Sequence, residues 1–204
     1  MENNFTPTVI KYVNGDVKIY ENLTKIDYDI IKNICRISGI KIGNSVNEIN
    51  IEAFYGCINA KYITIPNSVV KLGSRCFEFC REIRSIELPM HTKIIGVGAF
   101  KHCEKLNAII LPECLKTVRD STFSFCRQLK QLTIPKSVKY IGNFAFYNCK
   151  SLNKIICLSE TSPKLIGSYM FFNMPEDGTL YYPKGSDYTA WKDKLPDGWK
   201  LIEM

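Results

Sequence analysis

The sequence repeats itself every 23 residues, and this period constrains the fold more than any other feature. The pattern Phe-x-x-Cys recurs without a gap at residues 54–57, 77–80, 100–103, 123–126 and 146–149. Proline keeps the same step at Pro66, Pro89, Pro112 and Pro135. Apolar ladders precede the prolines at Ile63, Ile86, Ile109, Leu132 and Ile155, and two residues later at Ile65, Leu88, Leu111, Ile134 and Cys157. Repeats of this length bury their apolar face only against neighbouring copies, so the period predicts a solenoid.

Weaker copies extend the array at both ends. Residues 17–34 form a degenerate first copy, in which Ile26 stands one step before Ile49. After a two-residue insertion within residues 158–164, Phe171 and Met174 take the Phe and Cys positions. We therefore predict one domain over residues 1–204, with an N-terminal cap hairpin at 1–16, about seven repeats at 17–174 and a C-terminal cap at 175–204.

Each copy contains short elements. Residues 106–112 (LNAIILP) alternate apolar residues with a period of two, which predicts a strand that the proline ends. A segment such as 138–143 (VKYIGN) predicts a second extended piece. A segment such as 121–129 (STFSFCRQL) predicts a single helical or 3₁₀ turn that places Phe and Cys on one side. Stacking would then align like residues in rows about 4.8 Å apart.

Different signals mark the two ends. Asn14-Gly15 between alternating apolar residues predicts a hairpin. Near the other end, Ser186 is the expected N-cap of a short helix over 187–195 that Pro196 stops, and residues 198–204 can add a last strand. We interpret both segments as caps that shield the ends of the core.

Composition and charge narrow the function classes. Of 204 residues 46% are apolar and 23% charged, which is typical of a folded domain rather than a disordered chain. The formal net charge is +7, but Lys and Arg never form a run of four, so we expect no nucleic-acid partner. No apolar stretch approaches about 18 residues, so we expect no membrane span. The first 17 residues lack a signal-peptide pattern; this favours a cytoplasmic location, and a trimmed chain would allow a cell-surface or secreted one.

Five of the nine cysteines occupy one ladder position, which Met174 takes in the next copy. Methionine replaces a buried thiol but neither a nucleophile nor a disulfide partner, so we expect the ladder to be core packing. Disulfide formation and metal binding are the alternatives, but rungs about 4.8 Å apart exceed the usual Cβ separation of about 3.8 Å. His91 and His102 are the only histidines, which disfavours a metal site. If a thiol is reactive, we expect Cys76 or Cys114, which lie off the ladder.

A search for catalytic motifs supports no enzyme and no cofactor. The chain contains no GxSxG, Walker, HExxH or Rossmann glycine pattern. The neighbouring carboxylates of Glu78, Glu82 and Glu87 are expected to be solvated rather than an acid–base pair. A further apolar ladder runs through Ile49, Leu72, Ile95, Val118 and Ile141, and the glycines that follow it at Gly73, Gly96 and Gly142 are expected to be turn glycines.

Specificity should come from positions that differ between copies. On the main strands these alternate with the core residues and point outward. One row is Tyr62, Ser85, Ala108, Gln131 and Lys154, and the next is Thr64, Glu87, Ile110, Thr133 and Ile156. From these rows we predict the partner contacts Tyr62, Glu87, Ile110, Gln131, Lys154 and Ile156. The alternative is that the β-branched residues only reflect strand preference, and a row of Arg81, Arg127 and Lys150 on the turn side is interpreted as a solvated face.

The consensus LxxIxLPxSVxxIGxxAFxxCxx resembles the BspA-like class of leucine-rich repeats, and residues 132–152 are a nearly complete copy of it. The resemblance covers residues 17–204, although the first copy lacks Phe and Cys, Gly43 replaces the turn proline, and residues 90–93 (MHTK) depart from the usual NSVV or KSVK. It implies an α/β, β-rich repeat solenoid, a right-handed leucine-rich-repeat superhelix with short strands and short helical or 3₁₀ turns. It also implies protein binding through the strand face without catalysis, as in surface adhesion or host-protein attachment. An intracellular scaffold or effector-like interaction protein is the alternative interpretation.

Overall fold

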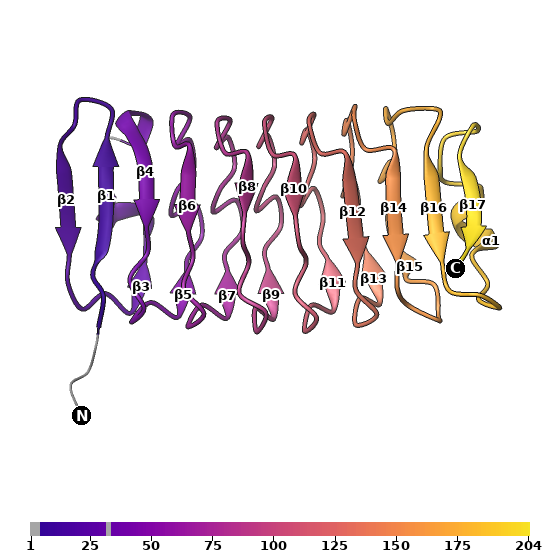
Figure 1. The fold of residues 1–204 in the computed structure, drawn as a ribbon, viewed down its shortest axis with the longest axis horizontal. Helices are drawn as coiled ribbons and strands as arrows, with labels where there is room; N and C mark the ends of the chain where they lie inside the picture. Colours follow the sequence, from indigo (N-terminus) through magenta and orange to yellow (C-terminus); the bar gives the residue numbers. More distant parts are fainter. Residues whose placement is uncertain (1–4, 32–33) are drawn as a thin grey trace.

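The apolar ladders of the sequence become two rows of short parallel strands along a straight solenoid (Figure 1). The computed structural model describes residues 5–31 and 34–204. The main face carries β4 (Ile37–Lys41), β6 (Tyr62–Thr64), β8 (Ser85–Ile86), β10 (Ala108–Ile109), β12 (Gln131–Ile134), β14 (Lys154–Cys157), β16 (Thr179–Tyr182) and β17 (Lys200–Glu203). The second face carries β3 (Lys25–Ile26), β5 (Glu48–Ile49), β7 (Lys71–Leu72), β9 (Ile94–Ile95), β11 (Thr117–Val118), β13 (Tyr140–Ile141) and β15 (Lys164–Leu165).

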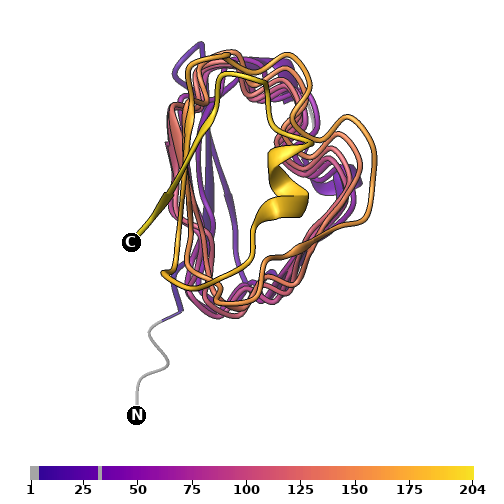
Figure 2. The same ribbon diagram turned by 90° about the vertical axis from the view of Figure 1, so that its right-hand side faces the viewer.

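The strands pair in the register that the sequence period predicts. Ser85 pairs with Ala108 and Gln131 with Lys154, one full repeat apart. The ladder of backbone hydrogen bonds is interrupted between β6 and β8 and between β10 and β12 on the main face, and between β9 and β11 on the second face. Seen end-on, the coils nevertheless follow one shared outline (Figure 2).

The turn side holds the coils together with a third set of backbone hydrogen bonds. The Phe77 N–H donates to the Ala99 carbonyl oxygen of the next coil across 2.9 Å, and each neighbouring Phe repeats this contact. Within a coil, the Cys103 N–H donates to the Phe100 oxygen at 3.1 Å, as in a 3₁₀ turn. His102, inside this turn, and Gly98, before it, have left-handed φ angles of 59° and 60°, so the turn does not continue into a helix. In the described residues, 3₁₀ helices occur at η1 (Tyr28–Ile30) and η2 (Ile34–Arg36).

The core is a column of phenylalanine rings enclosed by the Ile/Leu and Cys ladders. Phe54, Phe77, Phe100, Phe123, Phe146 and Phe171 stack with centroid separations of 5.5 to 6.0 Å. Beyond the last ring, Trp191 packs on Phe171 at 5.4 Å. All seven rings are buried, so the regular sequence produces one continuous apolar core.

The recurring glycines serve close packing rather than a left-handed turn. Gly96 does not have a positive φ, but a Cβ there would collide with the Gly73–Ser74 backbone of the preceding coil. Arg119 stands at this position in the next coil, where the ladder between β9 and β11 is interrupted. The expectation that these are turn glycines is therefore wrong: Gly96 is needed because the backbones of neighbouring coils approach closely, and not because of a left-handed turn.

An antiparallel hairpin covers the N-terminal end of the core. Its strands β1 (Thr8–Tyr12) and β2 (Val17–Tyr20) flank the expected turn at Asn14-Gly15, and β1 also pairs with β4. The second strand thus uses residues 17–20, which the sequence pattern assigns to the first repeat. Residues 1–4 of the expected cap lie outside the described residues.

The C-terminal cap contains α1 (Thr189–Lys192) and β17, and α1 lies inside the outline of the coils (Figure 2). The prediction that Ser186 is the N-cap of this helix is wrong. Tyr188 holds that position, and the Asp187 carboxylate accepts hydrogen bonds from the Thr189 N–H at 2.9 Å and hydroxyl at 2.7 Å. The Trp191 indole N–H donates to the Pro163 oxygen at 3.0 Å, which satisfies its polar group inside the core. None of the helices among the described residues has the length and apolar character needed to span a bilayer.

Candidate functional site

The main strand face carries two straight rows of outward side chains, because successive residues of a strand point to opposite sides. Pairing of Gln131 with Lys154 and of Thr133 with Ile156 aligns both rows along the solenoid. Between them, the core residues Leu132 and Ile155 are buried. Each coil therefore contributes one outward side chain to each row.

The six predicted contact residues all lie on this face, and their exposure differs. Ile110 is 71% exposed and Tyr62 44% exposed, while Glu87 and Gln131 are also exposed. Lys154 and Ile156 are half-buried. The ring of Tyr62 lies directly over Gly39 of the preceding coil, where a Cβ would collide with it. The glycine thus lets the ring lie flat along the row.

Small side chains create a depression in the middle of the face. It encloses about 470 Å³ over β8 and β10, and its lining includes Ser85, Glu87, Pro89, Met90, Ala108 and Ile110. Ser85 and Ala108 leave room where other coils carry Tyr62, Gln131 or Lys154. An exposed Met90 and Ile110 beside a carboxylate make this a mainly apolar hollow with one acidic group.

Both rows extend beyond the contact residues that were predicted from the sequence. Thr179 and Tyr181 of β16 extend them after the insertion, and the Lys154 ammonium lies 5.3 Å from the centre of the Tyr181 ring. Correcting the 23-residue step for the two inserted residues would have identified Tyr181. Met90 was missed because it lies beyond the strand, next to the turn proline.

On the turn side, side chains pair with one another. Glu104 bridges Arg81 and Arg127, each at 3.6 Å, which agrees with the interpretation of this row as a solvated face. The imidazole of His102 stacks between the rings of Phe79 and Phe125, at 4.5 and 4.3 Å. Burial, followed by the nearby Lys101 charge, lowers the pKa of His102.

The cysteine ladder is core packing, as the sequence predicts. Cys57, Cys80, Cys103, Cys126 and Cys149 are buried, and so is Met174 on the next rung. Burial raises the pKa of Cys103, which opposes formation of a nucleophilic thiolate. His102 and Cys103 are neighbours in sequence, but one stacks on aromatic rings and the other donates to a backbone oxygen.

The expectation that Cys76 is a candidate reactive thiol is wrong. Cys76 is fully buried and burial raises its pKa well above the ordinary value, so it is not an accessible thiol. Ala53, Ala99 and Ala145 hold the equivalent position, a signal in the sequence that this slot is small and internal. Cys35 is exposed and Cys114 is half-buried.

Glu78 is buried, which contradicts the expectation of a solvated carboxylate. It accepts a 2.6 Å hydrogen bond from Arg75 Nε and lies 3.2 Å from Lys101 Nζ, so its charge is compensated on both sides. Glu82 pairs with Lys105 at 2.7 Å. In residues 5–31 and 34–204, no three His, Cys, Asp or Glu side chains are grouped to hold a metal ion.

Comparison with known proteins agrees with this geometry. The sequence profile of BspA-type leucine-rich-repeat regions matches residues 13–90 and 71–187, with six copies. No curated protein sequence matches the chain.

Three solved bacterial structures share the fold. A leucine-rich-repeat protein of Bacteroides ovatus is 21% identical with a TM-score of 0.54, and the match covers 95% of this chain and 58% of that one. The T. pallidum leucine-rich-repeat protein is 24% identical with a TM-score of 0.58, over 82% and 70%. A leucine-rich cell-surface protein of Faecalibacterium prausnitzii is 23% identical with a TM-score of 0.57, over 89% and 54%. The chain thus spans little more than half the length of the first and third of these proteins.

Proposed function

Because the chain belongs to the BspA-type leucine-rich-repeat family, we propose that it is a non-catalytic protein-binding module whose partner lies on the main strand face. The observation that carries this proposal is the pair of aligned outward rows on β6 to β14, whose side chains are not needed for the core. The proposed contacts are Tyr62, Glu87, Ile110, Gln131, Lys154 and Ile156.

The chemistry of these rows suits a protein partner. The face combines an exposed aromatic ring, exposed aliphatic side chains and charges of both signs, which is the mixture found at protein interfaces. The hollow at Ser85 and Ala108 offers a place where a partner's apolar side chain would be buried against Ile110. Neighbouring Glu87 and more distant Lys154 would then set the orientation of the partner.

We further propose that binding serves attachment at a cell surface. Support comes from the family, and from the Faecalibacterium prausnitzii relative, which is described as a cell-surface protein. The partner would then be a protein of a host or of the extracellular matrix.

A comparative pull-down tests the choice of face. The baits are the wild-type chain, a variant with Tyr62→Ala, Glu87→Lys, Ile110→Asp and Lys154→Glu, and a control with Arg81, Arg127 and Lys150 changed to Ala on the turn side. Each bait is checked for folding by circular dichroism and then offered cell lysate and extracellular-matrix extract.

We expect one partner to be retained by the wild type and the turn-side control and lost by the strand-face variant. Retention from matrix extract supports attachment, and retention from lysate alone argues against it. A partner that all three baits hold equally would show that the main strand face is not the binding surface.

A further inference from the structure

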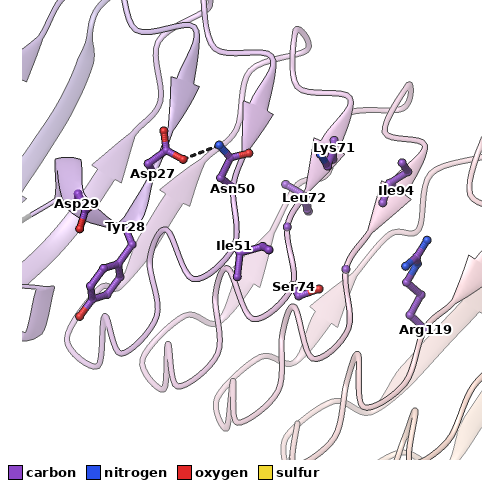
Figure 3. A pocket seen from close by; sticks show the side chains of 12 residues that line it. Asp27, Tyr28, Asp29, Asn50, Ile51, Lys71, Leu72, Ser74, Ile94 and Arg119 are labelled. Carbon is purple, nitrogen blue, oxygen red and sulfur yellow. Dashed lines mark hydrogen bonds between the residues drawn. The ribbon is translucent and has the colours of Figure 1, made fainter.

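A second depression lies on the opposite side of each coil from the main strand face. It encloses about 580 Å³ and runs along the solenoid beside β3, β5, β7 and β9. Lys71 and Ile94 line one rim, and Tyr28, Ile51 and Ser74 line the other (Figure 3). We refer to this depression as the second-face groove.

The floor of the groove follows one repeat position. Successive coils place Asp27, Asn50, Gly73, Gly96 and Arg119 there. The two glycines have no side chain, so they leave a trough between the longer residues at either end. Arg119, which replaces the glycine of the consensus, therefore bounds the groove at one end, and Asp27 lies at the other end, one coil beyond Asn50.

The two ends of the groove carry opposite charges. Asp27 and Asp29 lie at one end and Arg119 lies at the other (Figure 3). At the acidic end, the nearby Lys25 and Lys71 are both paired with Glu48, at 3.4 and 3.6 Å. Asp27 accepts a hydrogen bond from the Asn50 amide, and within the described part of the chain neither aspartate has a cationic partner.

Arg119 likewise has no acidic partner among the described residues. Its neighbour Asp120 accepts hydrogen bonds from the Asn143 N–H at 2.9 Å and side-chain amide at 3.2 Å, so that carboxylate is directed to the next coil. The guanidinium is therefore available to a carboxylate from outside the chain.

The middle of the groove is apolar and exposed. Ile51 is 64% exposed and Ile94 39% exposed, on opposite rims, and Tyr28 adds an exposed ring at the acidic end. An occupant with an apolar middle would remove these side chains from water.

We propose that the second-face groove binds an extended peptide segment with a cationic group at one end and a carboxylate at the other. Asp27 and Asp29 would receive the cation and Arg119 the carboxylate. Four coil steps separate Asp27 from Arg119, about 19 Å at the usual strand spacing. An extended chain of about six residues has this length. This site is on a different face from the proposed main-face contacts, so the two proposals succeed or fail separately.

The test uses four acetylated, amidated hexapeptides of the form X-Ala-Val-Ala-Val-Z. The terminal residues are Lys and Glu, Gln and Gln, Lys and Lys, or Glu and Glu. Binding to the full chain is followed by calorimetry and by amide chemical shifts of ¹⁵N-labelled protein. The variants are Arg119→Glu and, as a matched control, Arg127→Glu on the turn side.

We expect the Lys/Glu peptide to bind roughly fivefold more tightly than each of the other three, as for exposed charge pairs at two positions. Its binding should shift the amides of Gly73 and Gly96. Arg119→Glu should transfer the preference to the Lys/Lys peptide, whereas Arg127→Glu should leave the ranking unchanged. Any other ranking, no binding at millimolar peptide, or shifts that avoid both glycines would overturn the proposal.

Discussion

The thiol of Cys103 donates a hydrogen bond to the carbonyl oxygen of Phe77 in the preceding coil, across 3.2 Å. The contact repeats along the ladder, from Cys80 to Phe54, Cys126 to Phe100 and Cys149 to Phe123, at 3.0 to 3.3 Å. The same Phe77 oxygen also accepts the Cys80 N–H within its own coil. Cysteine therefore suits this position because it is small and apolar and still supplies a donor.

Replacing Cys103 by Ala should lower the free energy of unfolding by about 1–2 kcal/mol. The change removes a buried sulfur and one hydrogen bond, and the neighbouring coils close the space only in part. Urea unfolding followed by circular dichroism measures this difference. Cys35→Ala, at an exposed position, should stay within about 0.5 kcal/mol; equal losses in both variants would contradict the ladder's structural role.

Thiol accessibility should divide the nine cysteines sharply. In the native protein, Cys35 should react rapidly with a thiol reagent, and the five ladder cysteines and Cys76 should react only after unfolding, because they are buried. Mass spectrometry of peptides after timed labelling identifies each site. Rapid native labelling of Cys103 or Cys76 would be inconsistent with the packing described above.

Alkaline pH should destabilise the fold through the buried thiols. Burial raises the pKa of Cys149 from 9.0 to about 12. Below pH 9 both states hold the proton; above it the unfolded chain releases the proton that the folded chain retains. The unfolded state then binds fewer protons, so the free energy of unfolding falls as pH rises, by about 1.4 kcal/mol per pH unit for each such thiol.

Urea titrations at several pH values between about 9 and 12 measure this slope. Cys149→Ala should reduce the slope by the contribution of one thiol. Identical slopes in the wild type and Cys149→Ala would show that this thiol does not titrate differently in the two states.

Glu78→Gln should destabilise the protein by about 2 kcal/mol, the scale of a hydrogen bond to a charged group. The buried carboxylate is held by Arg75 and Lys101, and the amide cannot compensate both cations. Glu82→Gln is the matched control: its pair with Lys105 is more exposed, so less than about 1 kcal/mol is expected. Thermal and urea unfolding of both variants distinguish the two carboxylates, and a larger loss in Glu82→Gln would reverse the assignment.

Gly96→Ala should cost about 1–3 kcal/mol, because the added methyl meets the backbone of the preceding coil. Hydrogen exchange should show the loss of protection centred on β7 and β9, since coils interact mainly with their neighbours. Ser85→Ala on the open strand face should be close to neutral. Full retention of stability in Gly96→Ala would mean that the coils tolerate a wider spacing there.

Positions that follow the period could be predicted from the sequence, and those that depend on local backbone geometry could not. The outward placement of Tyr62 and Lys154 and the burial of Cys103 follow from the 23-residue step alone. Glu78 could not be placed by its polarity, because left-handed residues such as Arg75 redirect the chain within the turn segment. The burial of Cys76 could have been predicted from the alanines at the same position of other copies. Ser186 was assigned as the cap because it matches the usual residue type, but the helix begins at Thr189, with Tyr188 as the N-cap.

By itself, the sequence determined the solenoid, the strand register and the composition of the core, because identical coils can share one apolar core only when equivalent residues stack. Only the tertiary structure shows which surface depressions are formed by the residues that depart from the repeat consensus. Asp27 and Arg119, at the position where Gly73 and Gly96 stand, bound a groove with opposite charges at its ends, and the small Ser85 and Ala108 open a hollow in the strand face. These sites are formed by residues from several coils, and their shapes depend on distances across the stack that the order of residues along the chain does not contain.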